Sequence, residues 1–140
     1  MQTQYSPNQL NDAGFSDEDH DKVRALCSFL SCGPSDLSLE RHEHYDMAVF
    51  SYGQQEYAIG TDDEADSAWN QSLDSYIEDC IDPELDFDKL GTLGNYVKFD
   101  REMWIRDAKM DGRGHSLSSY DGAENEEKVG DVWFYIYRTN

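Results

Sequence analysis

Basic residues are scarce in this chain, which has 11 Lys and Arg against 30 Asp and Glu and a formal net charge of −19. Proteins that bind nucleic acid use Lys and Arg to neutralise phosphates, so this balance argues against direct binding to DNA or RNA. It argues equally against attachment to an anionic membrane surface. A basic protein partner, a cation or a salty environment suits such a charge better.

Long apolar runs and a cysteine framework are missing as well. No segment approaches the roughly 18 apolar residues of a membrane-spanning helix, and the opening MQTQYSPNQLNDAGF has neither the basic nor the apolar part of a signal peptide. We therefore expect a cytoplasmic protein. Cys27, Cys32 and Cys80 lack a CxxC motif and are expected to be reduced, buried small side chains. The alternative, a Cys27–Cys32 disulfide, would close only a short loop.

Aromatic residues, in contrast, are plentiful: the 140 residues include 3 Trp, 9 Tyr and 6 Phe. Large rings can close a small core, and acidic disordered proteins lack them, so we expect a folded chain. Its length fits one domain. Residues 1–15 are polar and contain Pro7 and Gly14, which predicts a flexible N-terminal arm, followed by a single acidic domain over residues 16–140.

Three helices are predicted from capping residues that precede apolar residues at helical spacing. Ser16 precedes the first helix, Thr61 and Glu64 match a capping box at the start of the second, and Asp100 can cap the third. The second helix is expected to bury one continuous stripe. The apolar residues that mark the three helices are Val23, Leu26, Cys27 and Leu30, then Ala65, Trp69, Leu73, Tyr76, Ile77 and Cys80, then Met103, Trp104 and Ala108.

Strands are predicted where aromatic and β-branched residues cluster. Residues 45–52 and 57–60 flank a turn at Gly53, which indicates a β-hairpin. The segment DVWFYIYR, residues 131–138, is the strongest strand pattern and is expected inside a sheet rather than at its edge. Residues 35–44 are ambiguous. The fold predicted is α+β, a small antiparallel sheet with about three helices packed on it.

Catalytic and metal-binding patterns are weak. The cysteines of the first two predicted helices fall on apolar stripes, and no GxSxG motif frames a serine. His42 and His44 are two residues apart, near Asp46, and a strand would place both on one face. Zinc needs further ligands, no second spaced cluster is present, and the acidic run does not follow the EF-hand pattern. We therefore predict no enzyme, no metal and no cofactor, and an exposed strand edge at the two histidines.

The glycine-rich segment DGRGH, Asp111 to His115, admits two interpretations. A loop of this kind with an Arg and a His can approach a phosphate. A phosphate cradle would have to follow a strand and open a helix, whereas this segment follows a predicted helix. The favoured interpretation is a helix C-cap and turn in which glycine supplies a positive φ.

The most lopsided feature is the stretch from Thr61 to Asp88, which has eleven carboxylates and no Lys or Arg. Residues three or four apart on a helix stand about 5–6 Å from each other, and a DNA strand carries one charge per roughly 3.4 Å. A helix rich in Asp and Glu can therefore act as a decoy for a protein that binds DNA. The predicted partner-binding residues are Asp62, Asp63, Glu64, Asp66, Asp74, Glu78, Asp79, Asp82, Glu84, Asp86 and Asp88.

The stretch LGNYVKFDREMWIRDAKMDG, residues 93–112, combines an Asn-Tyr-aliphatic start, an aromatic–acidic pair, an Arg-Asp pair and a final Gly. It resembles the C-terminal part of the ArdA-type antirestriction proteins of phages, plasmids and transposons. The resemblance extends from Trp69 onward, while residues 1–60 and the segment 112–127 depart from the family pattern. It rests on Asn95, Tyr96, Val97, Phe99, Asp100, Arg106, Asp107, Met110 and Gly112.

Members of that family are elongated acidic dimers that imitate bent B-form DNA and occupy the DNA groove of type I restriction enzymes. The resemblance implies a non-enzymatic counter-defence inhibitor that acts in the host cytoplasm and can form a homodimer. Its partner would be a basic DNA-binding host protein such as a restriction–modification enzyme. By the charge argument alone, another nucleic-acid-binding defence protein such as a CRISPR effector is an equally suitable partner.

Two alternatives follow from the same sequence. An acidic, salt-adapted protein of unrelated function would spread its charges over all faces instead of forming a continuous ridge. A small ligand-binding protein would have a concave pocket that contains the DGRGH loop with Arg113 and His115.

Overall fold

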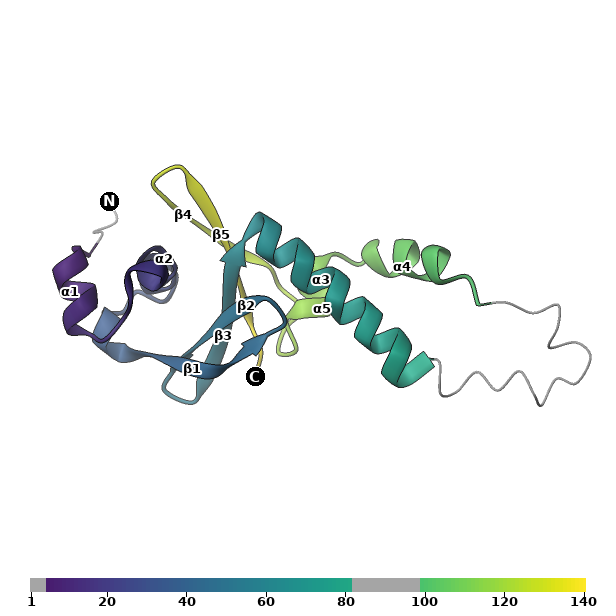
Figure 1. Ribbon diagram of the computed structural model, residues 1–140, viewed down its shortest axis with the longest axis horizontal. Coiled ribbons are helices and arrows are strands. Elements are labelled where there is room, and N and C mark those ends of the chain that lie inside the picture. The colour runs from purple at the N-terminus through teal and green to yellow at the C-terminus, as the bar shows by residue number, and fades with distance from the viewer. Residues whose placement is uncertain (1–4, 82–98) are drawn as a thin grey trace, which may run out of the picture.

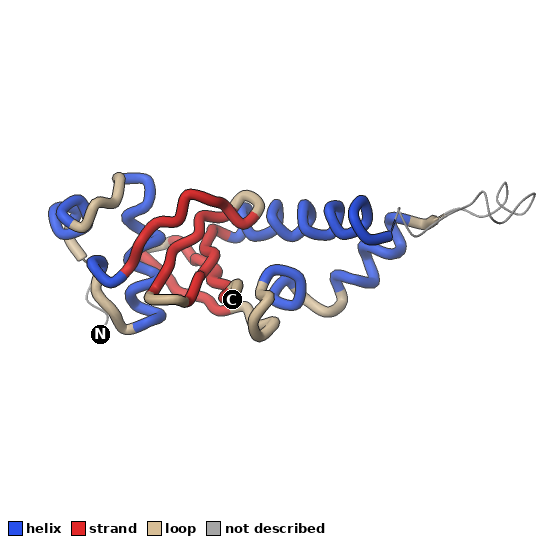
Figure 2. Tube along the Cα trace, turned by 90° about the horizontal axis from the view of Figure 1, so that it is seen from below, coloured by secondary structure: helices blue, strands red, loops and turns tan. Residues whose placement is uncertain are grey.

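The computed structural model describes residues 5–81 and 99–140. A twisted sheet forms the centre of the molecule, and helices cover both of its faces (Figure 1). Helix α3 (Asp62–Tyr76) runs from the sheet well beyond its edge, and α4 (Arg101–Lys109) lies alongside it (Figures 1 and 2). The molecule is therefore elongated, with a body built on the sheet and an arm built from two helices.

The sheet has five strands in the order β1-β2-β3-β5-β4, and every neighbouring pair is antiparallel. This confirms the predicted α+β class. The β2–β3 hairpin turns at Gly53, whose φ is 62°, as predicted. The C-terminal strand is flanked by β3 and β4 and lies inside the sheet, also as predicted. The strands are β1 (Leu37–His44), β2 (Met47–Tyr52), β3 (Gln55–Thr61), β4 (Asn125–Val129) and β5 (Val132–Arg138).

One face of the sheet packs against α1 (Pro7–Asp12) and α2 (His20–Leu30). Side chains alternate between the two faces of a strand, so Phe50, Ile59 and Ile136 point to this side. The 3₁₀ turns η1 (Asp17–Asp19) and η2 (Pro34–Asp36) flank α2 in the chain. The buried core on this face comprises Leu10, Phe15, Val23, Ala25, Leu26, Cys27, Leu37, Phe50, Tyr57, Ile59, Val129, Phe134 and Ile136.

The opposite face packs against α3 and the short helix α5 (Arg113–Leu117). Its residues are the alternate positions of the same strands, such as Val49, Ala58 and Tyr137. Covering both faces explains why β5 is a nearly continuous bulky run instead of an alternating one. The core here comprises Met47, Val49, Ala58, Ala65, Ala68, Leu117 and Tyr137.

The predicted flexible arm over residues 1–15 is wrong for the part that the structure describes. Ser6 and Gln9 form a capping box that starts α1. Leu10 is fully buried, and the Phe15 ring meets Phe50 edge-on at 5.9 Å between centroids. Two large side chains dock this segment on the sheet, and their polar neighbours on the solvent side concealed the pattern.

The three predicted helices are present as α2, α3 and α4. The stripe expected on the second helix is only partly buried: Tyr76 is 52% exposed, and Cys80 is exposed as well. Both lie where the helix has passed the edge of the sheet, Cys80 in the π-helical turn η3 (Ile77–Ile81). Helical periodicity continued to indicate a buried face where the sheet no longer provides a partner. In the described ranges, no helix combines the length and apolar character needed to cross a membrane.

Candidate functional site

Helix α3 begins with the predicted capping box. The Thr61 hydroxyl accepts a hydrogen bond from the Glu64 amide at 3.3 Å, and the Glu64 carboxylate accepts one from the Thr61 amide at 3.0 Å. Asp62 and Asp63 fill the first turn, where the helix dipole favours anions. The helix is also docked through Ala65, Ala68 and Leu73, so the backbone that carries its carboxylates is held in place.

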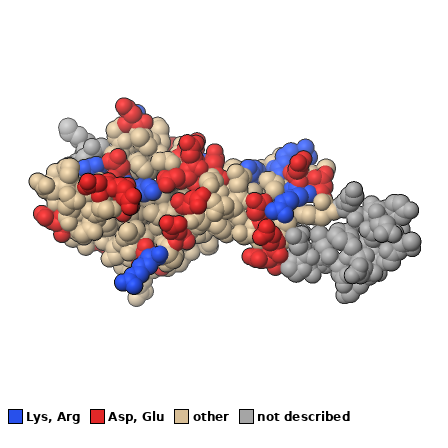
Figure 3. Space-filling view, in the orientation of Figure 1, with Lys and Arg blue, Asp and Glu red and all other residues tan. Residues whose placement is uncertain are grey.

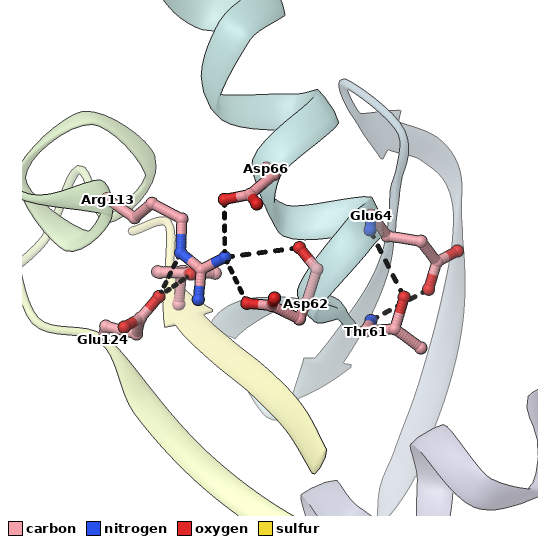
Figure 4. A network of polar contacts seen from close by, with 7 residues as sticks. Thr61, Asp62, Glu64, Asp66, Arg113 and Glu124 are labelled. Atoms are coloured by element: carbon pink, nitrogen blue, oxygen red, sulfur yellow. Dashed lines mark hydrogen bonds and ion pairs between the residues drawn. The ribbon is translucent and has the colours of Figure 1, made fainter. Parts of the chain in front are cut away.

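Arg113 binds three of the carboxylates around the start of α3 (Figure 4). Its Nη1 donates to Asp62 Oδ1 at 2.8 Å and to Asp66 Oδ1 at 2.9 Å, and its Nε donates to Glu124 Oε1 at 2.6 Å. The guanidinium also lies 4.6 Å from the centre of the Tyr135 ring. The Arg113 side chain is only 10% exposed. It is therefore a structural link between α3, α5 and β5, and it is not available to a ligand.

The electrostatics of this cluster follow from its burial. Burial alone would lower the pKa of Arg113, but the hydrogen bonds to Glu124 and Asp62 outweigh it and raise the pKa. The Tyr137 hydroxyl donates to Glu124, and burial together with this hydrogen bond raises the pKa of Tyr137. Arg113 stays charged and Tyr137 stays protonated at neutral pH. The ion pairs and hydrogen bonds of this cluster therefore persist at neutral pH.

Four of the predicted partner-binding residues are paired within the molecule. Asp62 and Asp66 bind Arg113, Glu64 lies 3.3 Å from Lys22, and Asp74 lies 2.9 Å from Arg101. Sequence reasoning treated the whole stretch as free negative charge, because its partners come from distant parts of the chain. Asp63, Glu78 and Asp79 are exposed and have no ion-pair partner within the described segments. Asp82, Glu84, Asp86 and Asp88 lie outside the described residues.

The residues that carry the family resemblance are only partly described. Asn95, Tyr96 and Val97 lie outside the described ranges. Phe99 is half-buried, and Asp100 caps α4 by accepting from the Met103 amide at 3.0 Å. Arg106 and Asp107 are exposed neighbours with 3.8 Å between their charged atoms, and Met110 is 82% exposed. The described motif residues therefore begin and extend α4.

The DGRGH segment combines a turn with the start of a helix. Gly112 has a φ of 90°, as expected for the turn interpretation, but Arg113 to Leu117 then form α5. Sequence reasoning missed this short helix and also β4, whose Glu126, Glu127 and Lys128 lack an apolar pattern. The phosphate interpretation loses its main residue, because Arg113 is already bound to three carboxylates.

A cleft of about 910 Å³ lies between α3, α4 and α5. Tyr45 reaches it from the β1–β2 turn, where its φ of 57° is unusual for a residue other than glycine. Asp111 and His115 of the DGRGH segment line it as well, so this loop contributes to a concave site although Arg113 does not. The lining residues are Tyr45, Ser72, Leu73, Ser75, Tyr76, Asp79, Cys80, Trp104, Asp107, Ala108, Asp111, His115 and Ser116.

The two histidines of β1 have separate partners. His42 Nε2 lies 3.5 Å from a Glu56 carboxylate oxygen, whereas His44 Nε2 lies 3.1 Å from the Leu117 carbonyl oxygen. Across residues 5–81 and 99–140, no group of three or more His, Cys, Asp or Glu side chains is placed to hold a metal ion. His44 instead ties β1 to the end of α5.

A pH dependence follows from His44. Burial lowers its pKa from the usual 6.5, so the unfolded chain binds a proton more readily than the folded chain. The stability that neutral His44 contributes is complete above pH 6.5. It is lost as the pH falls through the lower pKa that His44 has in the folded chain. H44Q keeps a hydrogen-bond donor but does not titrate. Urea unfolding at about pH 7.5 and 5.5 should show a larger acid-induced loss for the wild type than for H44Q; parallel losses would contradict this assignment.

Cys27 in α2 and Cys32, which follows this helix, are not reactive thiols. Burial and the neighbouring Cys32 raise the pKa of Cys27 to about 12, and burial raises the pKa of Cys32. Both thiols are free, as is that of Cys80. A thiol with a raised pKa is a poor nucleophile, because the thiolate is the reactive form.

Comparison of the chain with protein-family models, curated proteins and solved structures finds no match. The ArdA-type resemblance therefore stays a prediction.

Proposed function

We propose that this chain is a non-enzymatic, DNA-mimicking inhibitor that occupies the DNA-binding site of a basic host protein, such as a restriction–modification enzyme or a CRISPR effector. The observation that carries the proposal is the way α3 is attached to the sheet and extends from it. The helix is capped, docked on the sheet and extended beyond it, and it continues into η3 with Glu78 and Asp79 exposed. Rigidly placed carboxylates can replace phosphates without a large ordering cost on binding.

The distribution of charge supports the same proposal. On the face shown in Figure 3, acidic side chains occur from the body of the molecule to the far end of α3. Basic side chains gather over α4, next to that end. With 30 acidic against 11 basic residues, the long-range field around the chain is negative. Such a field steers a basic surface towards the protein and repels DNA.

The alternative of an acidic, salt-adapted protein is favoured by the internal ion pairs of α3, since four of its predicted contact residues have cationic partners. The two functions differ in their dependence on salt. A mimic competes for the same site as DNA, and its affinity falls steeply as salt rises, because binding releases counterions. A salt-adapted protein of unrelated function does not compete with DNA for a binding site.

The proposal is tested by displacement of a fluorescent DNA duplex from a purified type I restriction enzyme and from a CRISPR effector. We expect displacement from at least one at about 50 mM salt and an affinity lower by roughly ten-fold or more at about 200 mM. D63N/E78Q should weaken displacement several-fold more than D12N/E18Q, which removes the same charge from exposed residues at the other end of the molecule. The proposal is excluded if neither enzyme releases DNA at the lower salt concentration.

A further inference from the structure

The α3–α4 arm has two differently built sides. Arg101 donates to Asp74 at 2.9 Å and Lys109 donates to Asn70 at 2.6 Å, so the helices run antiparallel and their near cations are engaged. Asn70 and Asp74 lie four residues apart on one face of α3. Ser72, Tyr76 and Asp79 follow one another at spacings of four and three on a different face, which lines the cleft. Hydrogen bonds join α3 and α4 on the side of Asn70 and Asp74, whereas the side of Ser72, Tyr76 and Asp79 is open.

The open side is acidic and aromatic. Its described lining includes Asp79, Asp107 and Asp111 but no Lys or Arg. Arg106 lies beside Asp107 at 3.8 Å, yet its side chain is 72% exposed and is not part of the lining. The Tyr76 and Trp104 rings are stacked across the two helices, with 5.5 Å between centroids and 8° between planes. A cation is therefore the ligand that this cleft suits by charge.

The aromatic contacts elsewhere in the molecule make the stacked pair distinctive. Cations lie over the rings of Trp69, Tyr120, Trp133 and Tyr135, supplied by Lys109, Arg138, Lys128 and Arg113 respectively. Within residues 5–81 and 99–140, none lies over the Tyr76–Trp104 pair. Tyr76 is nevertheless 52% exposed. The pair offers an aromatic surface to a cation from another molecule.

We infer that the cleft binds an arginine side chain on a basic segment of the partner protein. The guanidinium would stack on the Tyr76–Trp104 pair while Asp107 and Asp111 accept its hydrogen bonds. Arginine fits better than lysine because its planar group stacks on rings and binds carboxylates through two parallel hydrogen bonds. The volume of about 910 Å³ exceeds one side chain, so the cleft has room for residues that flank the arginine. The inference rests on the proposed function. It adds a contact with the partner protein that duplex DNA, which has no arginine-binding cleft, does not make.

The test uses the complete chain and a short fluorescent peptide in which arginines alternate with glycine and serine. Fluorescence anisotropy compares it with peptides that carry lysine or uncharged citrulline at the same positions. We expect the arginine peptide to bind roughly three- to five-fold more tightly than the lysine peptide. The citrulline peptide should bind far more weakly than both.

Variants locate the site. D107N/D111N should weaken binding of the arginine peptide by roughly ten-fold, whereas D12N/E18Q, with the same loss of charge on exposed residues, should change it less than two-fold. Y76L should remove the preference for arginine over lysine. Tyr76 is half exposed, so this variant keeps its fold, which circular dichroism verifies. W104L provides the same test from the other helix.

Three results would overturn the inference. These are equal losses in D107N/D111N and D12N/E18Q, equal affinity for the arginine and lysine peptides, and a wild-type dimer in light scattering that Y76L converts to monomer. The last result would show that a second copy of this chain fills the cleft. Because D63N/E78Q leaves the cleft lining intact, loss of DNA displacement together with retained peptide binding would reject the mimicry proposal alone.

Discussion

Replacement of Arg113 by alanine is expected to lower the free energy of unfolding by roughly 3 kcal/mol, the lower end for a broken buried ion pair. The lower end applies because Asp62 and Asp66 are 63% and 56% exposed, although Arg113 itself is only 10% exposed. Without the guanidinium, these two carboxylates and Glu124 face one another with no cation between them. The link from α5 to α3 and to the Tyr135 ring is lost as well.

Urea unfolding followed by fluorescence measures this loss. R106A is the matched control, because it removes the same charge from a side chain that is 72% exposed, and it should change stability by less than about 0.5 kcal/mol. R113K should recover part of the loss, since lysine keeps the charge but lacks the fork of donors. Equal shifts in R113A and R106A would show that only net charge matters.

Replacement of Gly114 by alanine is expected to cost roughly 2–3 kcal/mol, as overpacking of a closed site does. A Cβ at this position would lie 2.5 Å from the Gly122 carbonyl oxygen and 2.8 Å from backbone atoms of Ala123 and Glu124. These are main-chain atoms, so no side-chain rotation relieves the clash. The segment 122–124 would have to move away from α5, and Glu124 would move with it from Arg113.

Gly33→Ala is the matched control for this substitution. Gly33 has a φ of −97°, and a Cβ there would meet only the Asp36 carboxylate at 3.7 Å. Alanine at such a site should be neutral or stabilise by up to about 1 kcal/mol, because it restricts the unfolded chain. Thermal unfolding of the two variants side by side would measure the difference. A G114A protein as stable as G33A would refute the close approach of α5 to residues 122–124.

Local signals predicted much of the fold. The capping box of Thr61 and Glu64, the turn at Gly53 and the aromatic run of β5 each lie within a few residues, and each was confirmed. The elements that escaped prediction depend on distant contacts. Helix α1 is held by Leu10 against the sheet, and β4 is a polar strand that exists because β5 provides its partner.

The candidate site was harder to predict for the same reason. Sequence reasoning found the acidic character of α3 but could not distinguish paired from unpaired carboxylates. Arg113 is 47 residues from Asp66 in the chain, and Lys22 is 42 residues from Glu64. The cleft combines the β1–β2 turn with three helices, and Tyr76 was expected to be buried. No local sequence pattern shows which part of a helix lies beyond the sheet and so has its apolar face exposed.

The two outer strands of the sheet, β1 and β4, carry charged residues that affect self-association of the chain. An edge strand has unpaired backbone groups that can recruit another chain and start aggregation. Here β1 is irregular between Leu39 and Glu43 and exposes Arg41 and His42, while β4 exposes Glu126 and Lys128. Charged, irregular edges disfavour strand-to-strand addition. The charged residues of both signs on β1 and β4 therefore help to keep the two outer strands of the sheet from pairing with another chain.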